Sequence, residues 1–185
     1  MNYANIKFND IANGEGVRVS LFVSGCTHHC KNCFNKETWD FDYGSPFTSD
    51  VQEKIISALA PSHISGLTLL GGEPMEPANQ KGLIDFVKTV KALYPNKTIW
   101  CYTGYLYDDE LLKPSRAHCP WTRELLSYID ILVDGEFKEE LKDITLRFKG
   151  SSNQRIIDVQ ASLLMDTVVL SPYNEKKSSK FRQII

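Results

Sequence analysis

Three cysteines close together are the feature of this sequence that most directly implies chemistry. Cys26, Cys30 and Cys33 form a C-x3-C-x2-C arrangement within one short segment. Thiolates in this pattern can ligate three irons of a cubane 4Fe–4S cluster. The fourth iron then has no cysteine and is open to a small-molecule ligand. An open position on a metal is typical of catalytic rather than structural sites.

A structural zinc site is the alternative for the same cysteines, with Cys101, Cys119 or a histidine as the fourth ligand. Structural zinc ligands usually come as two separated pairs, and this sequence has no second pair. His28 and His29 lie inside the cysteine segment, where binding the same metal as their neighbours would be strained. The pattern therefore favours an iron–sulfur cluster over zinc.

A second motif, Gly71-Gly72-Glu73-Pro74, directly follows the apolar segment 66–70. A glycine pair after a strand is often a plain turn. Its backbone can also approach a ligand closely, with carbonyls that accept hydrogen bonds from an ammonium group and Glu73 adding negative charge. Beside three clustered cysteines, ligand binding is the favoured interpretation. A valine at Gly72 is then expected to weaken ligand binding and to spare the cluster.

Apolar segments alternate with amphipathic ones, which predicts an α/β fold with a mainly parallel sheet. The expected strands are 6–11, 17–24, 66–70, 98–102 and 129–133, and 167–170 is a further candidate. One helix is expected to begin near Thr48 with an apolar face up to Leu59, and another to carry a stripe from Leu83 to Leu93. Ligands of parallel α/β folds bind at the carboxyl ends of the strands. Both motifs should therefore lie at the same edge of the sheet.

Length and composition indicate one soluble globular domain, 1–185, with 42% hydrophobic and 24% charged residues. Residues from about 160 onward are interpreted as a C-terminal extension, whose polar end at 174–182 is expected to be mobile. A net charge of −2 argues against nucleic acid as a partner. No stretch reaches the roughly eighteen apolar residues of a membrane span, and the N-terminus lacks an apolar leader. A cytoplasmic protein with reduced thiols is expected.

The two motifs together resemble those of the radical S-adenosylmethionine superfamily. Longer strings narrow the resemblance to the activating proteins of anaerobic (class III) ribonucleotide reductase; they lie at 13–26, 35–39, 102–105, 131–135 and 150–155. The resemblance extends from the N-terminus to about Val159 and is looser between Leu106 and Thr122. It implies a partial, open TIM-like (β/α) barrel, since 185 residues cannot complete the eight-unit barrel of about 250.

The resemblance also implies the site. Cys26, Cys30 and Cys33 would ligate one 4Fe–4S cluster and act catalytically through it, while S-adenosylmethionine chelates the fourth iron. The implied cofactor-binding residues are Asn32, Cys33, Phe34, Gly71, Gly72 and Glu73. Asn32 and Phe34 would lie along the nucleoside, and the glycine motif would hold the methionine amino group. Many superfamily members carry an aromatic residue just before the third cysteine, where this chain has Asn32.

The implied activity is that of an activase. A flavodoxin-type donor would supply one electron, and S-adenosylmethionine would be cleaved to methionine and a 5′-deoxyadenosyl radical. That radical would remove a hydrogen atom from a glycine near the C-terminus of the large subunit of anaerobic ribonucleotide reductase. The protein positions and shields the cofactor, so no general acid or base is nominated.

Other functions fit the same motifs. The chain could activate another glycyl radical enzyme such as pyruvate formate-lyase, although its short length and the 150–155 string favour the reductase. It could also be a radical enzyme acting on a small molecule, or an interaction module that only binds zinc or a cluster. The donor-rich segment 149–155 suits a carboxylate, a ribose or a helix cap, and the sequence does not choose among them.

Overall fold

The computed structural model describes residues 1–174, so most of the segment expected to be mobile lies outside the described residues. Within this part of the chain, one seven-stranded sheet has the order β3-β1-β2-β4-β5-β6-β7. The strands are β1 (Asn2–Asp10), β2 (Val17–Val23), β3 (Ser45–Pro46), β4 (Ile64–Gly71), β5 (Thr98–Tyr102), β6 (Ile131–Asp134) and β7 (Arg155–Asp158). The strands expected at 6–11, 17–24, 66–70, 98–102 and 129–133 are all present.

The four central strands, β2, β4, β5 and β6, run parallel to one another. Antiparallel strands flank them, with β1 on β2, β3 on β1, and β7 on β6. The two edge strands, β3 and β7, do not pair with each other, so the sheet stays open. The expected α/β class is confirmed, and the open sheet is consistent with a partial barrel.

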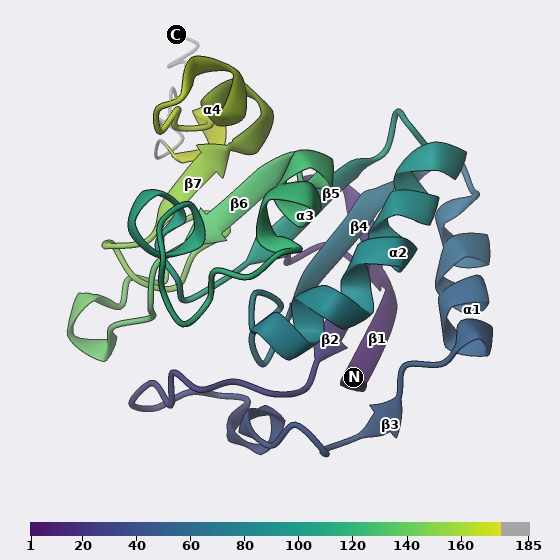
Figure 1. Cartoon of the computed structure of the whole chain (residues 1–185), viewed down its shortest axis with the longest axis horizontal. Helices are drawn as coiled ribbons and strands as arrows, with labels where there is room; N and C mark the ends of the chain where they lie inside the picture. The colour runs from purple at the N-terminus through teal and green to yellow at the C-terminus, as the bar shows by residue number, and fades with distance from the viewer. Residues whose placement is uncertain (175–185) are drawn as a thin grey trace, which may run out of the picture.

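Helices α1, α2 and α3 lie against one face of the sheet (Figure 1). The helices are α1 (Ser49–Leu59), α2 (Pro77–Leu93), α3 (Thr122–Tyr128) and α4 (Val159–Met165), with short turns η1 (Lys36–Trp39), η2 (Tyr107–Leu111), η3 (Glu139–Leu141) and η4 (Pro172–Asn174). Thr48 is the N-cap of α1, as expected. The apolar stripe of α2 is one residue shorter than expected, because Leu93 at its end is 55% exposed. No helix in residues 1–174 is both long and apolar enough to cross a membrane.

Successive residues of the central strands point to opposite faces of the sheet, and both faces are covered. On β5, Ile99 and Cys101 pack in the large core beneath the helices. Trp100, between them, belongs to a smaller cluster on the other face, with Phe148 and Tyr173 packed against it. The second face is therefore closed by the C-terminal third of the chain.

Arg18 fastens the N-terminal ends of three parallel strands to one another. This fully buried side chain of β2 donates hydrogen bonds to the Leu67 carbonyl of β4 and the Thr98 carbonyl of β5, both at 2.7 Å. Its Nε donates to Thr68 Oγ1 at 2.7 Å, and its guanidinium lies over the Trp100 ring. Burial lowers the pKa of Arg18 to about 10.

The C-terminal elements differ most from expectation. β7 and α4 were not predicted, because the apolar signal of β7 is only two residues long between Arg155 and Asp158. Asp158 caps α4 by accepting a hydrogen bond from the backbone N–H of Ala161. The strand considered at 167–170 is reduced to a single bridge between Leu170 and Ile157.

Candidate functional site

The loops that follow the four parallel strands line one cavity of about 560 Å³. Its lining includes every residue that the sequence nominated: Cys26, Cys30, Asn32, Cys33 and Phe34 after β2, and Gly71, Gly72 and Glu73 after β4. The loops after β5 and β6 contribute Gly104 and Phe137, and the segment 142–150 forms a further wall. The two motifs therefore meet at the carboxyl edge of the sheet, as parallel topology predicts.

The cysteine loop is tightly turned. His29 and Asn32 adopt left-handed backbone conformations, with φ of 54° and 59°. Histidine and asparagine tolerate this region better than most residues. The Cys33 N–H donates to the Cys30 carbonyl at 3.1 Å, which closes the turn between the second and third cysteines. The backbone thus gives a local reason for an asparagine, rather than an aromatic residue, before the third cysteine.

The start of the cysteine loop is anchored to η1. The N–H of Gly25 donates to the Thr38 carbonyl at 2.8 Å, and the N–H of Cys26 donates to the Trp39 carbonyl at 3.1 Å. Gly25 has a φ of 96°, and a Cβ there would lie 2.2 Å from the ring of Phe41. This position therefore requires glycine both for its backbone conformation and for space.

The environment of the Cys26 and Cys30 thiols favours their neutral form in the absence of a metal. Burial raises the pKa of the Cys26 thiol to about 11, with Glu73 and Glu76 adding to the effect. Burial, followed by the charge of Glu136, raises the pKa of the Cys30 thiol to about 12. Metal binding must therefore displace protons from these cysteines, because the thiolate is the ligand.

The residues present fit a cluster better than a zinc ion. No three potential metal ligands within residues 1–174 are arranged to hold a single ion. Cys101 is fully buried in the core beneath the helices, and Cys119 donates through its Sγ to Gln80 Oε1 at 3.2 Å. The cavity lining contains neither of these two cysteines, so it offers the three thiols of the loop and no fourth. Three thiols at one cavity match the donor set of a cluster with an open iron.

The glycine motif is built into the cysteine loop. The Gly72 N–H donates to the Val23 carbonyl at 2.8 Å, and the Glu73 N–H donates to the Gly25 carbonyl at 2.9 Å. A Cβ at Gly72 would lie 2.6 Å from the Gly25 oxygen and 2.8 Å from the Thr38 oxygen. A valine here would push on the cysteine loop itself, so we now expect it to disturb the cluster as well as ligand binding.

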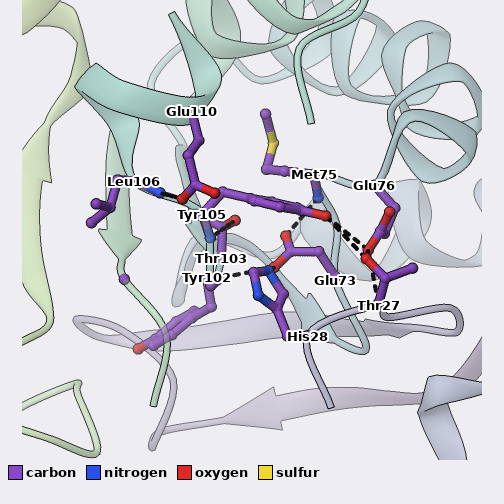
Figure 2. Close-up of polar contacts among 12 residues, drawn as sticks. Thr27, His28, Glu73, Met75, Glu76, Tyr102, Thr103, Tyr105, Leu106 and Glu110 are labelled. Carbon is purple, nitrogen blue, oxygen red and sulfur yellow. Dashed lines mark hydrogen bonds and ion pairs between the residues drawn. The ribbon is translucent and has the colours of Figure 1, made fainter. Parts of the chain in front are cut away.

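The Glu73 carboxylate is almost completely buried, and protein groups engage both of its oxygens. Oε1 accepts a hydrogen bond from Met75 N–H at 2.8 Å, and Oε2 accepts one from Gly104 N–H at 2.7 Å. His28 Nε2 lies 3.2 Å from Oε2 (Figure 2). Burial alone would lower the pKa of His28, but the hydrogen bond and charge of Glu73 outweigh it and raise the pKa. Glu73 thus links the loops after β2, β4 and β5.

Most polar groups of the donor-rich segment 149–155 form hydrogen bonds or ion pairs within the protein. Gln154 Oε1 accepts hydrogen bonds from the N–H groups of Gly150 and Ser151, at 2.9 and 3.2 Å. Arg155 pairs with Asp134 and Asp108, which uses donors that could otherwise bind a ligand. Lys149, Gly150 and Gln154 still line the cavity, so part of the segment remains available to a ligand.

Three residues beside the cysteines were not predicted from the sequence. Thr27, Glu76 and Tyr105 contact one another next to Cys26, and they come from three different loops. Glu76 lies immediately before α2, where the sequence pattern of a helix start hides any other role. Contacts across 49 and 78 positions have no local signal in a single sequence.

Known proteins are similar in sequence to this chain over most of its length. The family model described as a 4Fe-4S single cluster domain matches residues 12–157. The anaerobic ribonucleoside-triphosphate reductase-activating protein of Haemophilus influenzae is 46% identical over 158 residues, which cover 84% of this chain and 97% of that protein.

Two further relatives with the same name are more distant. The protein of Enterobacteria phage T4 is 40% identical over 156 residues, 84% of this chain and 93% of its own length. That of Escherichia coli K12 is 40% identical over 156 residues, 83% of this chain and 96% of its own length. The chain therefore belongs to the anaerobic ribonucleoside-triphosphate reductase-activating proteins, a radical S-adenosylmethionine family with a single 4Fe–4S cluster domain.

Proposed function

We propose that this chain uses its 4Fe–4S cluster together with S-adenosylmethionine to generate a glycyl radical on the large subunit of anaerobic ribonucleotide reductase. The observation that carries the proposal is the cavity in which Cys26, Cys30 and Cys33 lie beside the 71–73 motif. Family membership supports both the cluster and the reductase as the partner. A flavodoxin-type protein is the proposed source of the electron.

Cys26, Cys30 and Cys33 would bind three irons and leave the fourth for the amino and carboxylate groups of S-adenosylmethionine. When both are bound, the cluster and S-adenosylmethionine supply the one-electron chemistry that removes a hydrogen atom from a glycine. The role of the protein is to hold, orient and shield these groups. Its own residues need not transfer a proton.

The glycine motif is proposed to receive the methionine amino group. Gly71 has a φ of 113°, so its backbone conformation suits glycine, and the two glycines of the motif carry no side chain that would block the approach of a ligand. Glu73 contributes negative charge from beneath the loop, where its carboxylate holds the N–H groups of Met75 and Gly104. A cationic amino group is therefore favoured at this position.

Asn32 and Phe34 are proposed to contact the nucleoside. Both line the cavity, and the Phe34 side chain is 86% exposed at its rim. An exposed aromatic ring beside a cavity offers a face on which a base can stack. The lining of the cavity also includes Phe137, Leu146 and Phe148, which would help to keep water from the reacting atoms.

Electron paramagnetic resonance of the anaerobically reconstituted, reduced protein tests the proposal. A 4Fe–4S signal that changes on adding S-adenosylmethionine is expected, since the cofactor would bind the open iron. Adding the reductase large subunit should then give a glycyl radical signal, whereas pyruvate formate-lyase should give none. A cluster signal indifferent to S-adenosylmethionine would reduce the chain to a cluster-binding module. Radical formation only on pyruvate formate-lyase would reassign the partner.

A further inference from the structure

The peptide that follows Cys26 is held by one carboxylate oxygen. The backbone N–H and the hydroxyl of Thr27 both donate to Glu76 Oε1, at 2.9 and 2.6 Å. The Tyr105 hydroxyl donates to the same oxygen at 3.0 Å, and it lies 3.3 Å from Thr27 Oγ1 (Figure 2). One atom of Glu76 thereby joins the loop after β2 to the loop after β5.

These groups are withdrawn from water. Glu76 is 6% exposed and Tyr105 is fully buried. Among residues 1–174, no Lys, Arg or His forms an ion pair with Glu76. Its Oε1 accepts from neutral donors only, and its position at the N-terminus of the 17-residue helix α2 favours an anion. The nearby Arg116 guanidinium lies over the Tyr105 ring and donates to the Thr27 carbonyl at 3.4 Å. A buried anion in this setting is poorly screened by solvent ions.

Helix capping does not explain the Glu76 side chain. Glu76 occupies the N-cap position of α2, but its carboxylate accepts no hydrogen bond from the N–H groups of the first turn. The side chain reaches instead to Thr27, 49 residues earlier in the sequence. An oxygen that accepts from three donors suits a carboxylate, because a carboxylate oxygen is a stronger acceptor than an amide oxygen.

The Glu76 carboxylate lies next to the first cysteine of the cluster loop. The N–H from which it accepts a hydrogen bond at 2.9 Å belongs to the peptide that joins Cys26 to Thr27. Glu73 is assigned to the cofactor-binding motif, whereas Glu76 lies outside the lining of the cavity. Glu76 therefore acts on the site through Thr27 and through its electric field.

We propose that Glu76 is a positioning residue that fixes the backbone beside Cys26 and lowers the reduction potential of the cluster. This inference rests on the proposed function, because it needs a cluster ligated by Cys26. Reduction adds an electron to the cluster, and a fixed buried anion nearby disfavours the added negative charge. Net charge and hydrogen bonding around a cluster are among the factors that set its potential.

The direct test is a redox titration of the reconstituted Glu76→Gln variant, followed by electron paramagnetic resonance. Glutamine keeps the size of the side chain and removes its charge. The midpoint potential is expected to rise while the iron content stays close to that of the wild type. Glu110→Gln is the control: Glu110 is a half-buried carboxylate that also accepts a hydrogen bond from a backbone N–H, that of Leu106 at 2.8 Å, and it lies outside the lining of the cavity. Its midpoint potential should not change.

Tyr105→Phe separates the electrostatic effect from a structural one. This variant removes one hydrogen-bond donor to Glu76 and leaves the charge of the carboxylate. Less of that charge is then offset by hydrogen bonds, so its electrostatic effect on the cluster becomes stronger. Its midpoint potential is expected to fall, opposite in direction to that of Glu76→Gln. Loosening of the loop alone would shift both variants in the same direction, and that result would overturn the electrostatic part of the proposal.

The positioning part has a readout in the protein without iron. Amide hydrogen exchange of peptides covering 25–34 is expected to be faster in Glu76→Gln than in the wild type or Glu110→Gln. Unchanged exchange together with unchanged midpoint potentials in both Glu76→Gln and Tyr105→Phe overturns the inference. A wild-type cluster that forms but ignores S-adenosylmethionine contradicts the proposed function instead, and leaves the potential measurements valid.

Discussion

Glu73 and Glu76 lie three positions apart, and the structure gives them different partners. The Glu73 carboxylate holds N–H groups of Met75 and Gly104 beneath the glycine motif. The Glu76 carboxylate holds the peptide after Cys26. Both buried carboxylates accept hydrogen bonds from neighbouring loops, as buried charges require. At the scale of single residues, the site is therefore a set of loops that two carboxylates fasten to one another.

Replacing Cys30 by alanine is expected to abolish the cluster and the activity together. Three thiolates are the complete cysteine set of the cavity, and two would leave two irons without protein ligands. Iron and sulfide analysis after anaerobic reconstitution measures the loss. Cys119→Ala is the control, because Cys119 bonds to Gln80 away from the cavity. Full iron content in the Cys30 variant would contradict the ligand assignment.

Gly72→Ala is expected to lower the iron content, even though alanine adds only one carbon atom. That carbon would lie 2.6 Å from the backbone oxygen of Gly25, so the cysteine loop must shift to admit it. Gly150→Ala is the matched control in the same cavity, since its nearest neighbours are side-chain atoms of Phe137 at 3.1 Å or more. Equal iron content in the two variants would show that the contact at Gly72 does not matter.

At the scale of elements, the parallel strands were predictable because each is an apolar run bounded by turn residues. The same reasoning placed the cysteines and the 71–74 motif at one edge of the sheet. Short elements could not be predicted in this way: β7 has only Ile156 and Ile157 between charged residues, and β3 has two residues. Long-range contacts could not be predicted either, since nothing local distinguishes Tyr105 from a turn residue or Glu76 from a helix cap.

Arg18→Met is expected to destabilise the protein by about 2 to 4 kcal/mol, because several buried hydrogen bonds to a charged donor are lost. These bonds join β2, β4 and β5. Urea unfolding of the apo protein measures the change in the free energy of unfolding. Arg147→Met should cost less than about 1 kcal/mol, because the ion pair of Arg147 with Glu15 is partly exposed to solvent. Similar losses of unfolding free energy in the two variants would mean that the buried hydrogen bonds of Arg18 stabilise the protein no more than a surface ion pair does.

The turn between β1 and β2 predicts a pH dependence. Burial pushes the pKa of Asp10 upward, but hydrogen bonds from Asn13 and the Ala12 N–H outweigh it and hold the pKa below 3.8. A lowered pKa in the folded state means that the ionised group stabilises the fold above pH 3.8, and that this contribution disappears as the pH falls through the folded value.

Asp10→Asn is therefore expected to be less stable than the wild type at neutral pH, by about 1 kcal/mol. The difference should shrink well below pH 3.8. Urea unfolding of both proteins at the two pH values checks this expectation. A difference that grows with acidification would assign the pH dependence to another group.

At the scale of the whole molecule, the site and the main core lie apart. The large core fills the space between the sheet and α1, α2 and α3, whereas the cavity lies at the strand ends. Asn32 and Phe34 of the cysteine loop are exposed, and no strand or helix is formed between Ser24 and Asn35. The exposed part of the loop, at Asn32 and Phe34, can therefore respond to a ligand without disturbing the core.

Removal of iron with a chelator is expected to speed amide exchange in the cysteine loop and to leave β4 and β5 protected. The hydrogen bonds of these strands depend on the sheet and its core rather than on the cluster. Hydrogen exchange with mass spectrometry, in matched samples with and without iron, resolves the two regions. Loss of protection from exchange in β4 and β5 would show that the cluster stabilises the whole fold and not only the loop.

The order of the strands bears on how the protein is made. Apart from the two-residue β3, each strand from β2 onward pairs with the strand that precedes it in the chain, so the sheet can grow outward as residues leave the ribosome. The cysteine loop emerges more than a hundred residues before the wall at 142–150. A nascent chain thus presents its three thiols from one side while that wall is still unmade. The loop is therefore at its most accessible before the last quarter of the chain, which carries that wall, has been synthesised.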